Sequence, residues 1–294
     1  MVEKTMSYTS TLKEYLALTK PGIVTLVLIT TLGGMYIGAK GVLDTMTVFW
    51  TLLGTGLAAA GSAVVNMFFD KDIDRMMERT SSRPLPRGAV NPKGALLFGL
   101  TLIALSFVSL YFFVNLASAV LAMVAAFSYV VLYTVLLKRK TPVATEVGGI
   151  SGALPPVIGY VASSGTLDVK ALVLFLIMFM WQPPHFWVLA LKYKDDYAKA
   201  GIPTLPVSRG VFITKIKTLV YTVSLLPLSI IPYAIGMAGK IYFITAVVMS
   251  LLYTIYTLKF LFSKKEESMK LFFFSIIYIA VLFSVMVFDL VKDV

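Results

Sequence analysis

Three polar residues, Asn66, Asp70 and Asp74, stand where a long apolar run ends. On a helix, residues four apart share a face, so an amide and two carboxylates would form one column. Like charges one turn apart repel by about 0.2–0.5 kcal/mol, and a divalent cation would offset that repulsion. Mg²⁺ prefers such oxygen ligands and commonly takes one or two carboxylates together with substrate phosphates. The column therefore predicts a magnesium and phosphate site.

Basic side chains follow the column at Arg75, Arg79, Arg83 and Arg87. Guanidinium groups can bind phosphate oxygens in a bidentate fashion. The alternative is a solvated border of charges at the end of a membrane span. The spacing favours the site, because Lys71 with Arg75 and Asp74 with Glu78 place like charges one turn apart instead of neutralising each other.

A second charged cluster, LKYKDDYAKAG at 191–201, contains Asp195 and Asp196 among Lys192, Lys194 and Lys199. Alone, it is typical of a charged loop. Its surroundings echo the first cluster, because RPLPRG follows the first and PTLPVSRG the second. Repeated halves of membrane proteins often place a substrate site at their interface. We therefore expect the two clusters to face each other across a cavity, where Asp195 and Asp196 would anchor a second metal or a diphosphate.

The chain has one histidine, His185, within WQPPHFW at 181–187. Ionisable residues inside a membrane span are functional candidates. The imidazole could act as a base or ligate a metal centre. A packing role is the alternative.

These residues belong to a very apolar chain, with 58% hydrophobic residues and a mean hydropathy of +0.86. Runs of about 17–25 apolar residues can cross a bilayer, and they occur at 23–39, 48–69, 96–114, 117–137, 147–163, 171–191, 219–237, 241–258 and 271–290. We predict an all-α integral membrane protein with nine transmembrane helices in a single polytopic domain, 1–294. Its aspartate-rich loops lie at about 66–94 and 192–217.

The distribution of charge predicts the orientation of these helices. With the N-terminus in the cytoplasm, 22 of the 26 Lys and Arg residues fall on the cytoplasmic side, as the positive-inside rule requires. The net charge of +11 then belongs to that face and attracts anionic headgroups. Nucleic acid is excluded as a partner, because no basic soluble domain is present to bind it. The absence of cysteine excludes thiolate catalysis and cysteine metal sites.

The segment NMFFDKDIDRMMERTSSRPLPRG at 66–88, with WQPPHFW and YKDDYAKAGIPTLPV, resembles the UbiA superfamily of intramembrane prenyltransferases, and within it the haem-farnesylating branch. The resemblance runs from TKPGIV at 19–24 through the ninth span. It implies a UbiA-like bundle around a central cavity. It also implies transfer of a farnesyl group from farnesyl diphosphate to the 2-vinyl group of haem B, with water addition, giving haem O and diphosphate. Magnesium is the implied cofactor.

The resemblance also implies roles for individual residues. Magnesium would be held by Asn66, Asp70 and Asp74, with Asp195 and Asp196 serving a second metal or its waters. Phosphate charge would be neutralised by Arg75, Arg79, Arg83, Lys192 and Lys194, and haem would lie against Trp181 and His185. The family's second motif, D-x-x-x-D, has tyrosines at its ends here, Tyr193 and Tyr197. This departure leaves the ligands of a second magnesium open.

Other functions share parts of this pattern. A prenyltransferase acting on a quinone precursor or a lipid headgroup would carry the same acidic motifs. A transporter would instead favour ionisable groups at mid-membrane, and a non-catalytic assembly factor would not need paired acidic clusters. The expected location is the cell (plasma) membrane, with the active-site loops on the cytoplasmic side. Docking of a haem A synthase or a terminal oxidase assembly is left open.

Overall fold

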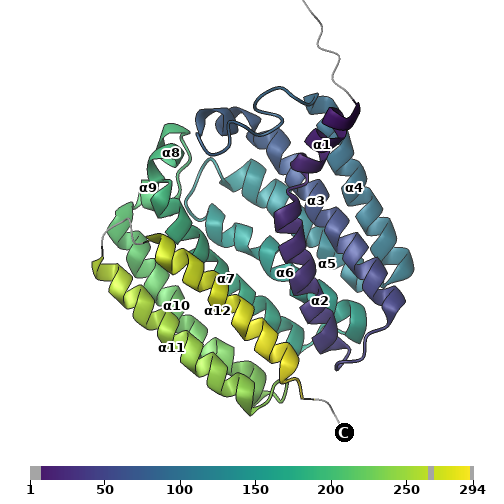
Figure 1. Cartoon of the computed structure of the whole chain (residues 1–294), viewed down its shortest axis with the longest axis vertical. Helices are drawn as coiled ribbons and strands as arrows, with labels where there is room; N and C mark the ends of the chain where they lie inside the picture. The colour runs from purple at the N-terminus through teal and green to yellow at the C-terminus, as the bar shows by residue number, and fades with distance from the viewer. Residues whose placement is uncertain (1–7, 264–267, 292–294) are drawn as a thin grey trace, which may run out of the picture.

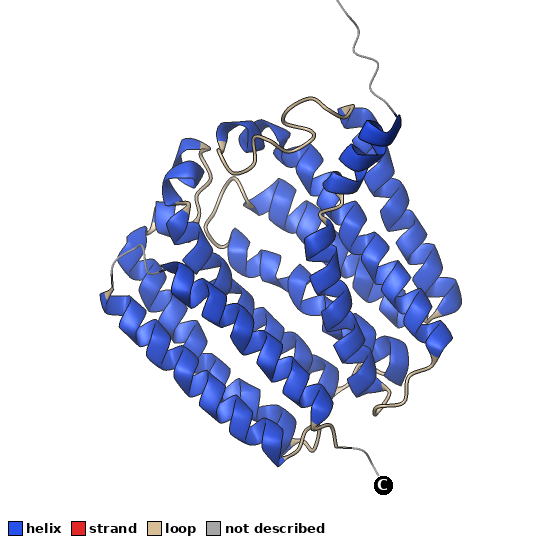
Figure 2. Cartoon of the chain, in the orientation of Figure 1, coloured by secondary structure: helices blue, strands red, loops and turns tan. Residues whose placement is uncertain are grey.

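The computed structural model describes residues 8–263 and 268–291, and every element named within these ranges is a helix (Figure 2). Figure 1 labels them α1 (Tyr8–Leu18), α2 (Pro21–Gly38), α3 (Thr45–Met76), α4 (Pro92–Phe113), α5 (Leu116–Phe127), α6 (Ala144–Ser164), α7 (Val169–Lys192), α8 (Lys194–Lys199), α9 (Leu205–Ser208), α10 (Gly210–Ala234), α11 (Lys240–Phe262) and α12 (Ser268–Phe288). A π-helical segment, η1 (Ser128–Leu137), directly follows α5. Together, α5 and η1 form one long helix.

Within the described residues, eight helices are long and apolar enough to cross a membrane: α2, α3, α4, α5 with η1, α7, α10, α11 and α12. The prediction of an all-helical membrane protein is confirmed. The fifth predicted span, 147–163, coincides with α6, which is not one of the eight. Because α6 packs against α2, α5 and α7, protein covers much of its surface. The nine-span count and the cytoplasmic N-terminus stay predictions.

Helix α6 meets α2 at very short range. A Cβ added to Gly159 would lie 1.9 Å from the backbone oxygen of Thr31, and one added to Gly34 would lie 2.0 Å from that of Pro156. Small residues let membrane helices approach each other this closely. Since Pro155 and Ile158 of α6 line the central cavity, this contact positions one wall of the site.

The helix boundaries follow local signals in most places. Side-chain oxygens accept hydrogen bonds from backbone N–H groups at the starts of four helices, as N-caps do: Asp44, Asn91, Asn115 and Asp168. One boundary differs clearly from the prediction, because α10 begins at Gly210 rather than at 219. Its first turns accommodate two lysines because both find partners. Lys215 Nζ donates to the Ser263 carbonyl at 2.5 Å, and Lys217 pairs with Glu146 at 3.2 Å.

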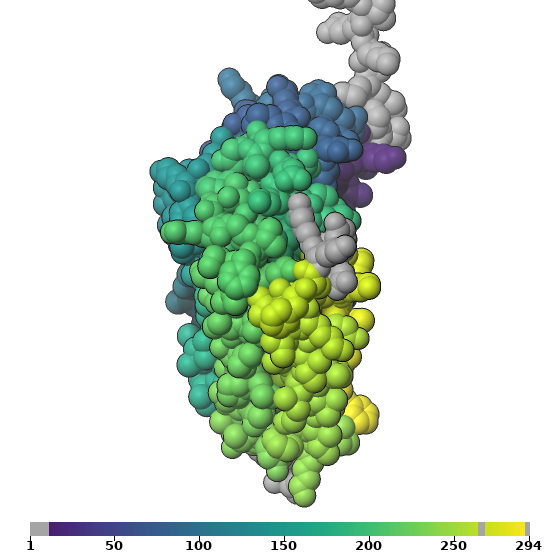
Figure 3. All heavy atoms as spheres, turned by 90° about the vertical axis from the view of Figure 1, so that its left-hand side faces the viewer, coloured from purple at the N-terminus to yellow at the C-terminus, as the bar shows by residue number. Residues whose placement is uncertain are grey.

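The first acidic cluster, at the end of α3, and the second, on α8, lie at the same end of the bundle (Figure 1). In Figures 1 and 3, the segment between α3 and α4 (blue) lies beside α8 and α9 (green). Helix α3 continues through the first acidic cluster to Met76, so the predicted loop 66–94 begins as a helix. Ile73 and Met77 pack with Tyr197 and Ile202 in a small buried cluster. This packing joins the end of α3 to α8.

Candidate active site

A cavity of about 520 Å³ opens among α2, α3, η1, α6 and α7. Its volume falls within the range of roughly 300–1,000 Å³ that is usual for ligand sites. Its charged and tyrosine lining consists of Lys20, Asp70, Asp74, Arg79, Arg83, Tyr129, Tyr133, Lys138 and Tyr197, with Asn66 beside them. The remaining walls are mostly small or apolar, with Trp181, Gln182 and His185 among them. A polar cluster and an apolar space therefore share one cavity.

The first acidic column forms as its spacing predicts. Asn66, Asp70 and Asp74 are all buried on α3, and the Asn66 side-chain N–H donates to Asp70 Oδ2 at 2.8 Å. Asp72 points away from the cavity. It is 58% exposed and binds Arg139 through both carboxylate oxygens, at 2.7 Å each. The helix thus separates two acids that face the cavity from one that does not.

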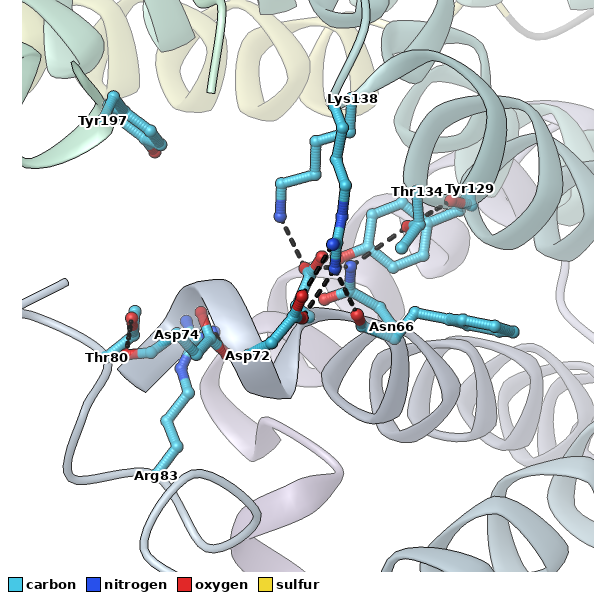
Figure 4. Close-up of polar contacts among 12 residues, drawn as sticks. Asn66, Asp72, Asp74, Thr80, Arg83, Tyr129, Thr134, Lys138 and Tyr197 are labelled. Atoms are coloured by element: carbon cyan, nitrogen blue, oxygen red, sulfur yellow. Dashed lines mark hydrogen bonds and ion pairs between the residues drawn. The ribbon is translucent and has the colours of Figure 1, made fainter. Parts of the chain in front are cut away.

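One cation contacts each member of the column. Lys20 Nζ donates to Asn66 Oδ1 at 2.8 Å, and Lys138 Nζ lies 2.5 Å from Asp70 Oδ2. Arg83 Nη1 pairs with Asp74 Oδ2 at 2.7 Å (Figure 4). These contacts offset the repulsion between the two carboxylates. Burial, together with repulsion from Arg83 and Lys138, lowers the pKa of Lys20 to about 7.

The four arginines after the column separate into two pairs. Arg79 and Arg83 line the cavity. Arg75 instead donates its Nε–H to the Pro86 carbonyl at 2.7 Å, and Arg87 pairs with Glu14 of α1. Two of the four guanidinium groups therefore lie at the cavity, and one of them, Arg83, is already paired with Asp74 there.

The second charged cluster contacts the cavity through a tyrosine. Helix α8 carries Asp195, which is exposed, and Asp196, which is half-buried. Neither is among the lining residues of the cavity, and the same holds for Lys192 and Lys194. Tyr197 does line the cavity, and its hydroxyl lies 3.5 Å from Arg79 Nη2. The structure thus brings α8 beside the first cluster but leaves the charged groups of α8 outside the cavity lining.

His185 and Trp181 lie together on the cavity wall formed by α7. The His185 ring is stacked between Trp181 and Phe272 of α12, with centroid distances of 4.6 and 4.5 Å. Its Nδ1 lies 2.7 Å from Ser275 Oγ, and Trp181 Nε1 donates to the Ser275 carbonyl at 2.8 Å. The pair is therefore rigidly placed beside the cavity.

Comparison with known proteins identifies the family. The model of the UbiA prenyltransferase family matches residues 27–282. The chain belongs to the UbiA prenyltransferase family. Among curated relatives, the protoheme IX farnesyltransferase of Aquifex aeolicus (strain VF5) is 67% identical over 99% of this chain and 100% of its own length. The protein of that name from Neorickettsia sennetsu is 43% identical over 95% of this chain and 93% of its own.

Solved structures share the UbiA fold. One, from a study of digeranylgeranylglyceryl phosphate synthase in membranes, aligns with a TM-score of 0.82 at 23% identity, over 96% of this chain and 99% of its own. A UbiA homologue from Archaeoglobus fulgidus, solved with GPP and Mg²⁺, aligns with a TM-score of 0.66 at 20% identity, over 93% and 99% of the two chains. At these identities the likeness concerns the fold.

The column in this UbiA chain has the chemistry of a magnesium site. Asp70 Oδ1 is buried and has no hydrogen-bond partner, an arrangement that is costly unless a cation or donor reaches the atom. Within residues 8–263 and 268–291, no group of three His, Cys, Asp or Glu side chains could hold a metal alone. Asp70 could therefore hold magnesium with Asp74, and with Asn66 once Lys20 leaves its Oδ1. A diphosphate would supply the remaining ligands.

Sequence reasoning missed several lining residues of the UbiA cavity: Lys20, Tyr129, Tyr133, Lys138 and Gln182. The KRK triplet at 138–140 counted only toward the cytoplasmic charge, and Lys20 was given no site role although it lies in the TKPGIV motif. The tyrosines lie on the π-helical segment η1, and such segments occur frequently at functional sites. The available signal was that Lys20 and Lys138 each flank a predicted span. Such residues can reach an acidic motif on a neighbouring helix.

Proposed function

We propose that the chain transfers the farnesyl group of farnesyl diphosphate to the 2-vinyl group of haem B, with addition of water, and releases haem O and diphosphate. The observation that carries this proposal is the 67% identity, over 99% of the chain, to a relative named protoheme IX farnesyltransferase. The cavity supports it, because an oxygen and cation cluster for a diphosphate opens into an apolar space flanked by stacked aromatic rings.

The diphosphate is bound at the charged end of the cavity. Asn66, Asp70 and Asp74 would hold magnesium, which would supply positive charge to stabilise the departing diphosphate. The guanidinium groups of Arg79 and Arg83 donate charge-assisted hydrogen bonds to the phosphate oxygens. Arg75 has the same assigned role and must leave the Pro86 carbonyl to perform it.

The second cluster is proposed to complete the diphosphate site. Asp195 and Asp196 serve a second metal or its waters, and Lys192 and Lys194 neutralise phosphate charge. Support comes from Tyr197, the neighbouring residue of α8, which already lines the cavity.

The reaction breaks the C–O bond between farnesyl and diphosphate and forms a C–C bond to the terminal vinyl carbon. The cation left beside the porphyrin is captured by water, which loses one proton and leaves a hydroxyl group. Tyr129 and Tyr133, stacked at 5.8 Å between centroids, offer aromatic faces that stabilise the allylic cation. The small and apolar walls around Ala126 and Ile158 limit premature attack by water.

The proposed location is the plasma membrane, with the charged end of the bundle in the cytoplasm. The excess of Lys and Arg on that side supports this orientation. Farnesyl diphosphate then enters from the side on which α8 and the 77–91 segment lie. Docking of a haem A synthase or a terminal oxidase assembly stays a prediction.

Product analysis by mass spectrometry tests this function. The purified protein in detergent is incubated with haem B, farnesyl diphosphate and magnesium, and a parallel sample contains EDTA. The expected product is a haem that has gained one farnesyl group and one water, only with magnesium. Prenylation of 4-hydroxybenzoate or of a lipid headgroup, with no haem product, would keep the chemistry and overturn the acceptor. Absence of transfer to any acceptor would overturn the proposed prenyl transfer.

A further inference from the structure

The imidazole of His185 is held in one orientation by groups on two helices. Trp181 and Phe272 cover its two faces, with interplanar angles of 21° and 24°. The Ser275 carbonyl accepts a hydrogen bond from Trp181 Nε1 at 2.8 Å, which fixes one of these covering rings. A sandwiched ring cannot rotate without displacing its neighbours. The nitrogen that faces Ser275 in this arrangement is Nδ1.

The hydroxyl of Ser275 decides which nitrogen of His185 carries the proton. Ser275 Oγ donates its single hydrogen to the Phe272 carbonyl at 2.6 Å, as serine does within a helix. Ser275 Oγ also lies 2.7 Å from Nδ1. Because the carbonyl can only accept, both contacts are hydrogen bonds only if this oxygen accepts from Nδ1. In a neutral imidazole one nitrogen donates and the other accepts. Nδ1 then carries the hydrogen, and Nε2 keeps its lone pair.

The second nitrogen has no competing partner. Within the described ranges, no protein group forms a hydrogen bond with Nε2, and Nε2 is not among the atoms buried without a partner. His185 lines the 520 Å³ cavity. Its position on α7 is seven residues before the last residue, Lys192, which is about 10 Å along a helix. An unprotonated nitrogen is thus presented to the apolar part of the cavity, below the charged cluster.

We propose that Ser275 is a positioning residue that holds His185 in the Nδ1–H form, so that Nε2 binds the iron of the haem acceptor. The second half of this proposal rests on the proposed function. A hydrogen bond to the distal ring nitrogen commonly fixes the tautomer and orientation of a metal-ligating histidine, and histidine is a common axial ligand of haem iron. Ligation would hold the porphyrin on the α7 and α12 side of the cavity.

The tautomer can be measured directly because the chain has one histidine. Protein labelled with ¹⁵N-histidine gives one pair of ring-nitrogen resonances, recorded without haem or magnesium. We expect Nδ1 to be protonated and Nε2 unprotonated. In Ser275→Ala this preference should be lost, and Ser275→Thr, which keeps the hydroxyl, should restore it. The exposed Ser284 of the same helix provides the matched control, because Ser284→Ala should leave both resonances unchanged. A protonated Nε2 in the unmodified chain would overturn the proposal.

Iron ligation is tested separately by absorption spectra of the detergent-solubilised protein with haem B. We expect a histidine-ligated spectrum that is lost in His185→Ala and partly shifted in Ser275→Ala, while Ser275→Thr and Ser284→Ala keep it. Zinc protoporphyrin and metal-free protoporphyrin should both still bind to His185→Ala. Their binding would show that the pocket is intact. An unchanged haem spectrum in His185→Ala would overturn ligation. Failure of haem farnesylation would leave the tautomer result standing, so the two failures are distinguishable.

Discussion

Lys138 and Asp70 are 68 positions apart in the chain, yet the lysine Nζ lies 2.5 Å from Asp70 Oδ2 inside the cavity. The lysine belongs to the segment that follows η1, and the aspartate belongs to the acidic column of α3. The second oxygen of the same carboxylate is buried without a partner. One oxygen of Asp70 is thus neutralised by the protein, and the other has no protein partner and is the oxygen to which the proposed magnesium would bind.

Replacing Asp70 by Asn should abolish most magnesium-dependent turnover and leave haem binding nearly unchanged. We expect a loss of about 100-fold or more, because removing one preorganised group that stabilises transition-state charge typically costs about 10²–10³ in rate. Initial rates over a range of magnesium concentrations, with a haem titration of the same samples, measure both effects. Asp72→Asn is the matched control, since Asp72 lies outside the cavity and binds Arg139. Full turnover by Asp70→Asn would refute the metal assignment.

Arg83→Ala should raise the KM for farnesyl diphosphate by about 10- to 100-fold, because hydrogen bonds to charged groups contribute about 1.5–3 kcal/mol. Arg83 lines the cavity, whereas Arg75 is bound to the Pro86 carbonyl. Arg75→Ala should therefore raise this KM less. Steady-state kinetics at saturating haem distinguishes the two. Equal effects would show that Arg75 leaves Pro86 when the diphosphate binds.

Gly159→Ala should destabilise the bundle, because the new methyl group would lie 1.9 Å from the Thr31 backbone oxygen. Overpacking typically costs about 1–3 kcal/mol, and here the obstacle is backbone rather than a flexible side chain. The unfolding temperature in detergent should fall accordingly. Gly22→Ala is the control, because nothing lies within 4 Å of a Cβ added there. Equal unfolding temperatures for the two variants would contradict the close contact of α2 and α6.

Asp196→Asn should raise the magnesium concentration needed for half-maximal turnover if α8 serves a second metal. Tyr197→Phe should have a much smaller effect, because it keeps the ring at the cavity and removes only a hydroxyl 3.5 Å from Arg79. Magnesium titrations of the initial rate compare the two variants with the unmodified chain. An unchanged magnesium requirement in Asp196→Asn would exclude this carboxylate from metal binding and leave Tyr197 as the contribution of α8.

Much of the fold and part of the site could be predicted from local sequence. Long apolar runs predict transmembrane helices, because a lipid-exposed backbone must satisfy its hydrogen bonds within a helix. The column of Asn66, Asp70 and Asp74 was predictable because residues four apart share a helical face, whatever surrounds that helix. The same helical period places Asp72 on a different face of α3, away from the column. The role of α6 was less visible, since its small residues and prolines serve contacts with other helices rather than with lipid.

The partners of these residues were decided only by the tertiary structure. Lys20 contacts Asn66, which is 46 positions away in the chain, and Ser275 contacts His185, which is 90 positions away. No periodicity in the sequence encodes such pairs, because they form only when separate helices pack at a particular depth and rotation. The same holds for Arg83, which faces the cavity, and Arg75, which does not. The sequence alone determined which chemical groups are available and on which helical face they lie. The packing of the bundle decided which groups share a cavity and which nitrogen of the single histidine is left open to it.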